Sequence, residues 1–342
     1  MEHLAVPLAF LISLAVCAMV GQYGAKDVPD GGRKDHERPV STLGGLGIAF
    51  GHLGALAWFL SFGDNGKCLA DCGRFVPVEW GWPILIAFGL GFLVTGLIDD
   101  LRPMAARTKL VLLAWLSVGV CLAFWYGLGG SDGPFGSLRH AEWLLAGGAL
   151  WVFVLSNATN FMDGSNGLAL GCSAIMLVAL FMLGAPTAAL VSAIIGFLVF
   201  NLTGGLFAGD TGAFYVGFWV AALSLLGAAL GEYSIWVPPL IALPFLTDII
   251  LTILWRGRRG GNVMQAHREH AYQLLRRSGW GHLRVALLWW GMTAVCGALA
   301  LFAANAFDWR GEMAVFAVTL AVSIALWIWQ RRTYWPRVSA PG

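Results

Sequence analysis

Long apolar stretches alternate with short polar segments along almost the whole of this 342-residue chain. A helix needs roughly 20 apolar residues to cross the hydrocarbon core of a bilayer, which is about 30 Å thick. Eleven stretches approach that length and no soluble domain fits between them. The pattern therefore predicts one all-α domain over residues 1–342, a polytopic integral membrane helix bundle. The predicted transmembrane helices lie near 3–21, 43–62, 81–98, 109–129, 142–159, 167–184, 186–203, 212–231, 235–255, 284–306 and 312–330.

The distribution of basic residues predicts the orientation, since cytoplasmic loops of membrane proteins are enriched in Lys and Arg. With the N-terminus outside, 17 of the 21 basic residues fall in inward-facing segments and 4 in outward-facing loops. We therefore expect an N-out, C-in protein of the cytoplasmic membrane. This orientation places Cys68 and Cys72 in one outward loop, where a disulfide is permitted and two free thiols are the alternative.

The composition narrows the class of protein further. Hydrophobic residues make up 58% of the chain and charged residues 12%, against about 25% charged residues in soluble domains. The net charge is only +2, and no basic patch with interleaved aromatic residues occurs. We therefore expect membrane lipids, but no nucleic acid, among the partners.

Polar motifs follow the inward ends of the first, third, fifth, seventh and ninth predicted helices. A carboxylate at the end of a membrane helix is costly unless it is solvated or paired. Solvation explains one such Asp, but four on one face favour a functional site. Carboxylate and amide oxygens suit Mg²⁺, whereas no Cys and His set has the spacing of a zinc site. The candidates on this face are Lys34, His36, Asp99, Asp100, Lys109, Asn160, Asp163, Asn166, Asn201, Asp210, Arg268 and His270.

Basic side chains share this face with the carboxylates. Cations beside a metal site favour phosphoryl transfer, which depends on positioning and on stabilising charge. Anchoring near anionic lipids is the alternative for Arg256, Arg258 and Arg259, and a plain surface position is the alternative for His36. His52, in the middle of a predicted helix, is expected to be packed or hydrogen-bonded to a neighbour.

A transporter is the alternative from another class, because apolar helices interrupted by prolines such as Pro238, Pro239 and Pro244 are typical of transporters. Transporter sites lie near the midplane of the bilayer, at the interface between structural repeats. Here the predicted helix centres carry almost no ionisable residues, and the polar groups gather at one end. This pattern favours an enzyme over a transporter or an inactive membrane scaffold.

Three motifs resemble those of the polyprenyl-phosphate N-acetylhexosamine-1-phosphate transferases, which form glycosyltransferase family 4. They are the Asp99-Asp100 pair, the stretch Asn157–Ala169 and the stretch Phe207–Gly212, in the same order as in the family. The resemblance covers a motif-bearing core of about residues 27–280. It leaves the last two predicted helices, about residues 284–330, outside that core.

The basic loop departs from the commonest family pattern. Many members have further histidines where this chain has Tyr272 and Gln273. The Arg-x-His-x-Tyr-Gln form resembles the branch of undecaprenyl-phosphate GlcNAc-1-phosphate transferases that start O-antigen-type polysaccharides. A muramyl-pentapeptide substrate is therefore not expected. Because this loop is expected to face the sugar, the choice among N-acetylhexosamines stays open.

The resemblance implies roles for the candidate residues. Asp210 is similar to the family's Mg²⁺-binding aspartate, and Asn160 matches a position that can join it, with Mn²⁺ a possible substitute. The candidate catalytic residues are Asp99, Asp100 and His270. Lys109 matches a phosphate-contacting lysine, and Asn166 matches a position that contacts uracil. Arg268 and His270 match the start of a basic histidine motif, and both are expected to hold phosphate oxygens of the substrates. The other expected substrate-binding residues are Asp163, Asn201, Lys34 and His36.

The implied reaction joins a UDP-N-acetylhexosamine to undecaprenyl phosphate. An oxygen of the lipid phosphate attacks the phosphorus that carries the sugar, and UMP leaves. A phosphate monoester has a second pKa of about 6 and is already mostly ionised, which favours direct attack. Asp99 as base or nucleophile stays open. The product would start a lipid-linked polysaccharide at the cytoplasmic face of a bacterial inner membrane, and a homodimer is compatible with the sequence.

Overall fold

The computed structural model describes residues 4–27, 39–62, 76, 80–128, 141–261 and 267–339. Lys34, His36, Cys68 and Cys72 lie outside the described residues, so the expectations for them stay predictions. The helices are α1 (Ala5–Tyr23), α2 (Gly44–Phe62), α4 (Gly81–Leu101), α5 (Ala106–Gly127), α6 (Ala141–Met162), α7 (Leu168–Met182), α8 (Ala188–Asn201), α9 (Gly209–Ala229), α10 (Val237–Ile241), α11 (Leu243–Arg258), α12 (Ala271–Arg277), α13 (His282–Ala306) and α14 (Trp309–Ser339). The strands are β1 (Lys26–Asp27) and β2 (Val40–Ser41).

The described chain is an all-helical membrane protein apart from one two-stranded sheet. Eight helices are long and apolar enough to cross a bilayer, judged by length and composition: α1, α2, α4, α5, α6, α9, α13 and α14. Helices α7 and α8 are also apolar but have only 15 and 14 residues. The fold class is thus confirmed, while the prediction of about eleven crossings and of an N-out, C-in orientation stays a prediction.

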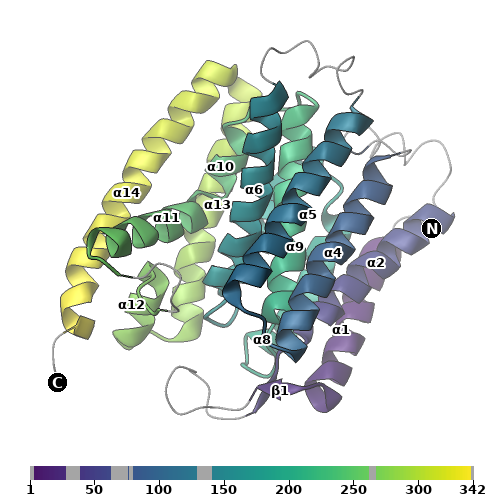
Figure 1. The fold of residues 1–342 in the computed structure, drawn as a ribbon, viewed down its shortest axis with the longest axis horizontal. Coiled ribbons are helices and arrows are strands. Elements are labelled where there is room, and N and C mark those ends of the chain that lie inside the picture. Colours follow the sequence, from purple (N-terminus) through teal and green to yellow (C-terminus); the bar gives the residue numbers. More distant parts are fainter. Residues whose placement is uncertain are drawn as a thin grey trace.

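The prediction of one continuous helix over 235–255 is wrong. The chain forms two helices there, α10 and α11, which meet at Ala242. Pro244 occupies the first turn of α11 and has no N–H to donate to the preceding turn, so it starts a new helix rather than continuing the old one. In Figure 1, α11 runs at a steep angle to the neighbouring helices. The short helix α12, which the apolar pattern did not predict, follows within the basic loop.

Helix α9 lies at the centre of the bundle, where it packs against α2, α4, α6 and α7 (Figure 1). Almost every side chain between Thr211 and Gly227 is buried, as expected of a helix that is apolar on all sides. His52 of α2 confirms its expected place in the core, because its Nδ1 lies 2.9 Å from the hydroxyl of Tyr215 on α9. The first turn of α9, which carries Asp210, is therefore anchored in the best-packed part of the molecule.

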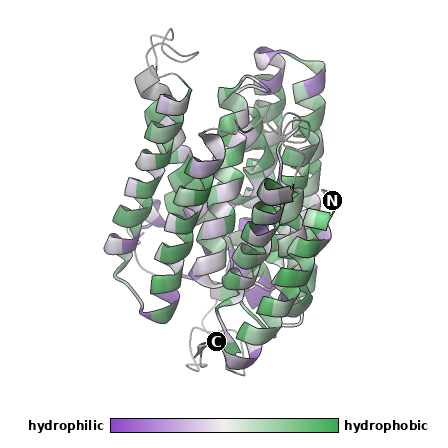
Figure 2. Cartoon of the chain, turned by 90° about the vertical axis from the view of Figure 1, so that its right-hand side faces the viewer, coloured by the Kyte–Doolittle hydropathy of each residue, from purple (hydrophilic) through white to green (hydrophobic). Residues whose placement is uncertain are grey.

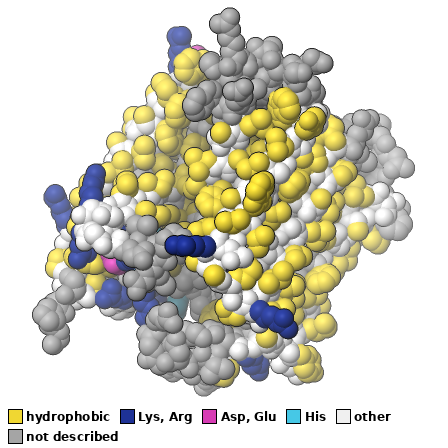
Figure 3. All heavy atoms as spheres, in the orientation of Figure 1, with side chains coloured by type: hydrophobic (Ala, Val, Ile, Leu, Met, Phe, Trp, Pro, Cys, Tyr) yellow, Lys and Arg dark blue, Asp and Glu magenta, His cyan; other side chains and the backbone are white. Residues whose placement is uncertain are grey.

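The sides of the bundle are apolar. Figure 2 shows the hydrophilic residues mainly near the helix ends, and Figure 3 shows hydrophobic side chains over most of the visible face. Bulky side chains such as Trp115 and Val318 are exposed there, 72% and 66% respectively. Large exposed apolar surfaces mark contact with a membrane or a protein partner, and here they surround helices of membrane-spanning length.

A β-hairpin and its neighbours join the start of α2 to the start of α9. β1 and β2 pair antiparallel, and Ser41 of β2 accepts a hydrogen bond at its carbonyl from the Phe207 N–H (2.9 Å). The Gly45 N–H, in the first turn of α2, donates to the carbonyl of Ala208 (3.0 Å). Backbone contacts therefore fix the segment that leads directly into Asp210.

Candidate active site

Lys109 of α5 lies between two carboxylates. Its Nζ is 2.9 Å from Oδ2 of Asp99, near the end of α4, and 2.6 Å from Oδ2 of Asp210, in the first turn of α9. The three side chains are 15–22% exposed, so a solute can reach the cluster. The second oxygen of Asp99 accepts a hydrogen bond from the Met104 N–H (2.7 Å). The structure thus brings together three residues that were predicted from the sequence as a metal ligand (Asp210), a catalytic aspartate (Asp99) and a phosphate-contacting lysine (Lys109).

Asp100 is adjacent to Asp99 in sequence but contacts the N-terminus of α9 rather than Lys109. Its Oδ1 accepts a hydrogen bond from the Asp210 N–H, and its Oδ2 accepts one from the Thr211 N–H, both at 2.9 Å. The Thr211 hydroxyl also donates to Oδ2. A carboxylate in this place accepts hydrogen bonds from the first N–H groups of α9, and the positive end of the helix dipole stabilises its negative charge. Asp100, predicted as catalytic, is therefore placed as a residue that positions Asp210.

Gly209 provides the close approach that this arrangement requires. Its φ is +67°, and a Cβ atom at this position would collide with the carbonyl oxygen of Thr42 and with Oδ2 of Asp100. Gly231, at the other end of α9, has a similar φ of +80° but nothing within 4 Å of a Cβ. A side chain at either glycine would therefore strain the backbone, but only a side chain at position 209 would also collide with neighbouring atoms.

We expect Gly209→Ala to lower the unfolding temperature more than Gly231→Ala. Both substitutions cost about 1 kcal/mol for alanine at positive φ, and only Gly209→Ala adds about 1–3 kcal/mol of overpacking. Thermal unfolding of the two purified variants in detergent measures the difference. Equal shifts would contradict the close packing of Gly209 against Asp100.

The end of α6 supplies the amide of the site. The Nδ2 of Asn160 donates to Oδ1 of Asp210 over 2.6 Å, which fixes the second oxygen of that carboxylate. Asn157, one turn earlier, donates instead to the carbonyl of Phe153 on its own helix (2.8 Å) and is buried. Of the two asparagines in this motif, the structure therefore places Asn160 at the site, as predicted.

Asn201, predicted to bind substrate, is placed as a link between two loops. Its Oδ1 accepts a hydrogen bond from the Gly167 N–H (2.6 Å), and its Nδ2 donates to the carbonyl of Leu206 (2.8 Å). Its side chain is buried. Trp290 of α13 holds the same loop by donating to the carbonyl of Gly167 (2.9 Å). Asn201 thus ties the loop after α6 to the segment before α9 and faces the protein rather than a ligand.

Asp163 lies in the loop after α6, close enough to Asp210 and Asp100 for their charges to affect its pKa. Burial and the negative charges of Asp210 and Asp100 raise the pKa of Asp163 well above its usual value. This interaction shows that Asp163, Asp210 and Asp100 approach one another from three segments of the chain. A cation that binds among them would lower the pKa again, because an opposite charge favours the ionised carboxylate.

Asn166 is held from a direction that the sequence did not indicate. Its backbone N–H lies 3.3 Å from Nδ1 of His282, and the hydroxyl of Ser165 lies 3.0 Å from the same nitrogen. The other ring nitrogen of His282, Nε2, is 2.8 Å from the Arg276 guanidinium. The loop predicted to contact uracil is therefore supported by the start of α13 and by α12.

Asp248 organises the basic histidine motif. Its Oδ1 accepts a hydrogen bond from the Ala271 N–H (2.7 Å) at the start of α12 and lies 3.7 Å from Nδ1 of His270. Both Asp248 and His270 are buried. Asp248 was not among the predicted site residues. A buried acid inside the apolar stretch 235–255 is the signal that could have identified it.

Tyr272 and Gln273, where the chain departs from the family pattern, are parts of the fold of this motif. The Tyr272 hydroxyl donates to the carbonyl of Phe161 (3.0 Å), its ring packs closely on Gly164, and the side chain is buried. Gln273 accepts a hydrogen bond at Oε1 from the His270 N–H (3.1 Å). The loop was expected to face the sugar, but the side chains of Tyr272 and Gln273 contact other parts of the protein instead.

His270 lies next to the helix end that carries Asn160. Its ring stacks on that of Phe161 with centroids 6.4 Å apart, and Phe161 follows Asn160 directly. Arg268 is half-buried, and its carbonyl accepts a hydrogen bond from Arg277 (3.3 Å). Burial and the charges of His270 and nearby arginines lower the pKa of His267 to about 4, so that side chain is neutral near pH 7. The histidine motif thus borders the carboxylate cluster through α6.

The donor set of the cluster fits a hard cation. Among the described residues, no three His, Cys, Asp or Glu side chains are grouped as metal ligands. However, Mg²⁺ is usually bound by only one or two carboxylates together with water and substrate phosphates. Asp99 and Asp210 already share one cation, the Lys109 ammonium, and Asn160 lies beside them. Asp210, Asp99 and Asn160 are therefore the residues that would hold Mg²⁺.

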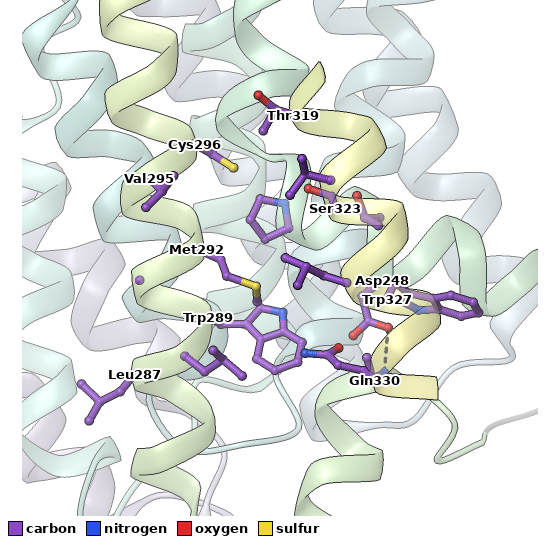
Figure 4. A pocket seen from close by; sticks show the side chains of 17 residues that line it. Asp248, Leu287, Trp289, Met292, Val295, Cys296, Thr319, Ser323, Trp327 and Gln330 are labelled. Carbon is purple, nitrogen blue, oxygen red and sulfur yellow. Dashed lines mark hydrogen bonds between the residues drawn. The ribbon is translucent and has the colours of Figure 1, made fainter. Parts of the chain in front are cut away.

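An apolar cavity of about 490 Å³ lies between α11, α13 and α14 (Figure 4). In Figure 4, Trp289, Met292 and Cys296 of α13 point toward α14, and Asp248 lies near one end of the cavity. Since Asp248 also holds the start of α12, the cavity reaches the back of the histidine motif. Its walls suit a hydrocarbon chain, and its one acidic end borders the polar site.

Comparison with known proteins places these features in a family. The profile of glycosyl transferase family 4 matches residues 82–228, from α4 to α9. The chain is similar to a phospho-N-acetylmuramoyl-pentapeptide-transferase of Synechococcus sp. (strain RCC307), with 32% identity over 275 residues, 69% of this chain and 74% of the relative. It is also similar to a probable undecaprenyl-phosphate N-acetylglucosaminyl 1-phosphate transferase of Bacillus subtilis (24% over 343 residues, 92% and 90%). A third relative is a decaprenyl-phosphate N-acetylglucosaminephosphotransferase of Mycobacterium tuberculosis (strain H37Rv) (28% over 330 residues, 85% and 78%).

The fold, the site and these relatives define a membrane phosphotransferase of the polyprenyl-phosphate sugar class. The chain belongs to glycosyl transferase family 4. Membership of a transferase family accounts for the polar helix ends and argues against the transporter alternative.

Proposed function

We propose that this protein transfers an N-acetylhexosamine-1-phosphate from a UDP-sugar to undecaprenyl phosphate and releases UMP. The observation that carries the proposal is the contact of Lys109 with both Asp99 and Asp210, beside Asn160. A cation held by carboxylates at several helix ends is suited to bind phosphate and to balance charge that develops during its transfer.

The lipid phosphate is the proposed nucleophile. One of its oxygens bonds to the phosphorus that carries the sugar, the bond from that phosphorus to the UMP oxygen breaks, and UMP leaves. Each oxygen of Asp99 already accepts one hydrogen bond, from Lys109 and from the Met104 N–H respectively, which lowers its nucleophilicity. This supports direct attack by the already ionised lipid phosphate over a covalent intermediate on Asp99.

The residues of the chain orient the phosphates in this proposal. Lys109 contacts diphosphate oxygens, Arg268 and His270 approach from the loop before α12, and Asp100 keeps Asp210 in place. Asp210, Asp99 and Asn160 would hold Mg²⁺, which would supply Lewis-acid stabilisation of the leaving UMP. The site faces the cytoplasm in the proposed N-out, C-in orientation, where nucleotide sugars are available.

The sugar is proposed to be an N-acetylhexosamine without a muramyl pentapeptide. Two of the relatives, aligned over 85–92% of this chain, are named as GlcNAc-phosphate transferases. Relatives named for the muramoyl pentapeptide are aligned over 69–86% of this chain, so coverage does not separate the two groups. The Tyr-Gln ending of the histidine motif is the feature that supports the choice.

The decisive experiment reconstitutes the protein with undecaprenyl phosphate, Mg²⁺ and a panel of UDP-N-acetylhexosamines and measures UMP release. Release with one or more of these sugars, dependent on the lipid phosphate, is expected. UDP-muramyl-pentapeptide is included as the comparison substrate. If none of the nucleotide sugars gave lipid-dependent UMP release, the proposed reaction would be wrong.

The cavity between α11, α13 and α14 is proposed to accept part of the polyprenyl chain. We expect Ser323→Phe, which places a ring in its wall, to raise the KM for undecaprenyl phosphate by roughly 10-fold, a loss of about 1.4 kcal/mol of binding. A short-chain polyprenyl phosphate should be affected less. Val318→Phe on the exposed face of α14 is the control, since Val318 does not line the cavity. Equal KM values for both variants and both lipids would argue against this assignment.

A further inference from the structure

Arg331, near the end of α14, is buried although it is a cation. It is 3% exposed and lies outside the segment that the family profile matches. Its guanidinium donates from one terminal nitrogen to the carbonyl of Glu269 (2.7 Å) and to the hydroxyl of Thr252 (3.1 Å). Glu269 directly precedes His270. A residue from the last helix therefore touches the backbone of the histidine motif.

Arg331 is held by rings as well as by hydrogen bonds. Its guanidinium carbon lies 4.6 Å from the ring centroid of Trp327 and 5.5 Å from those of Trp255 and Trp335. The Nε and the other terminal nitrogen have no hydrogen-bond partner among the described residues. Burying an incompletely bonded cation is costly, and aromatic faces offset only part of that cost. An apolar side chain would fill the same space without this cost, so packing alone does not explain the arginine.

The contacts of Arg331 lead to His270 by two routes. The first is direct, through the Glu269 carbonyl. In the second, Thr252 donates to Oδ1 of Asp248 over 3.1 Å, and the same oxygen holds the Ala271 N–H and faces His270. A further contact on this segment comes from Arg256, whose guanidinium donates to the carboxylate of Glu269 over 2.6 Å. Residues 269–271 are thus fixed by α11 and α14 together.

We propose that Arg331 is a positioning residue for the transfer reaction: it sets the place of His270 through the Glu269 carbonyl and the Thr252–Asp248 pair. The inference rests on the proposed function, because His270 must act at the reacting phosphates for its position to affect the rate. In this proposal α14, which lies outside the sequence motifs, contributes a residue that positions the site.

The test compares Arg331→Met with Arg332→Met in the full-length protein. Arg332 is the adjacent, exposed arginine of the same helix. Arg331→Met is expected to reduce kcat by roughly 10- to 100-fold, since a small misplacement of a catalytic group has effects of this size. The KM for the UDP-sugar and for the lipid phosphate should stay within about twofold, and Arg332→Met should match the wild type.

A double-mutant cycle with His270→Ala separates positioning from stability. If Arg331 acts through His270, the double variant should be no slower than His270→Ala alone. Losses that multiply would overturn the proposal. Thr252→Val removes only the second route and should give a smaller loss of the same kind, which keeps the proposal testable if Arg331→Met does not fold. A wild-type kcat in Thr252→Val and Arg331→Met alike would also overturn it.

Hydrogen exchange of residues 267–273 provides a readout that does not depend on the reaction. Faster exchange of these amides in Arg331→Met than in Arg332→Met is expected, because the segment loses the contacts of Arg331 with the Glu269 carbonyl and with Thr252, which supports Asp248. Unchanged exchange would refute the positioning role. If the wild type released no UMP but the exchange difference appeared, the proposed function would fail while the contact of Arg331 with the motif would stand.

Discussion

Replacing Asp210 by Asn is expected to reduce UMP release by roughly 10³-fold, the size of effect found when a preorganised charge-stabilising group is removed. Both oxygens of Asp210 are engaged, one by Lys109 and one by Asn160. A neutral amide cannot balance the Lys109 charge, and it is a weaker ligand for Mg²⁺. The rate of UMP release at saturating substrates and several Mg²⁺ concentrations measures the effect.

The control for Asp210→Asn is Glu232→Gln, which removes an exposed carboxylate just beyond α9. We expect a normal rate for Glu232→Gln. Unfolding temperatures of both variants are measured alongside, because Asp210→Asn also removes the ion pair with Lys109, whereas Glu232→Gln does not. A normal rate in Asp210→Asn would rule out Asp210 as the metal and charge-balancing centre.

Replacing Lys109 by Met should reduce the rate by roughly 10²- to 10³-fold, because two carboxylates then lose their shared cation and the diphosphate loses a contact. Lys109→Arg is expected to recover only part of the rate, since a planar guanidinium does not reproduce a point charge between two carboxylates. Added Mg²⁺ should raise the unfolding temperature of Lys109→Met more than that of the wild type. The cation then has no ammonium to compete with.

Arg107→Met is the matched control for Lys109, since Arg107 is exposed in the same first turn of α5. Its kcat and its response to Mg²⁺ should equal those of the wild type. A Lys109→Met variant that kept its rate would show that the ion pairs with Asp99 and Asp210 are structural only.

The helices could be predicted closely because a bilayer imposes a length and an apolar composition on each segment. The ends of α2, α4, α6 and α13 fall within a few residues of the predicted limits. The break between α10 and α11 was missed, although Pro244 marks it. The pattern of hydrophobicity continues through the break, since both pieces consist mainly of apolar residues.

The roles of individual site residues were harder to predict than their presence. Asp99 and Asp100 are neighbours in sequence, but consecutive side chains on a helix point about 100° apart. One therefore meets Lys109, and the other meets the N-terminus of α9, 110 residues further along the chain. Asp248, His282 and Arg331 also contact partners from other segments, 23 to 117 residues away along the chain. A single sequence shows which residue types are available, but not which of them the packing brings together.

The shortness of α7 and α8 has a consequence for the membrane around the protein. Helices of 15 and 14 residues span only about 21–22 Å, against about 30 Å for the hydrocarbon layer. Their ends at Leu168 and Asn201 adjoin the two loops of the site, which need water. Where these two helices face lipid, we expect the bilayer to thin locally or water to enter a recess about 8 Å deep, so that the headgroup of the proposed lipid substrate meets the site without leaving its leaflet. Turnover should consequently depend on the thickness of the bilayer into which the protein is reconstituted.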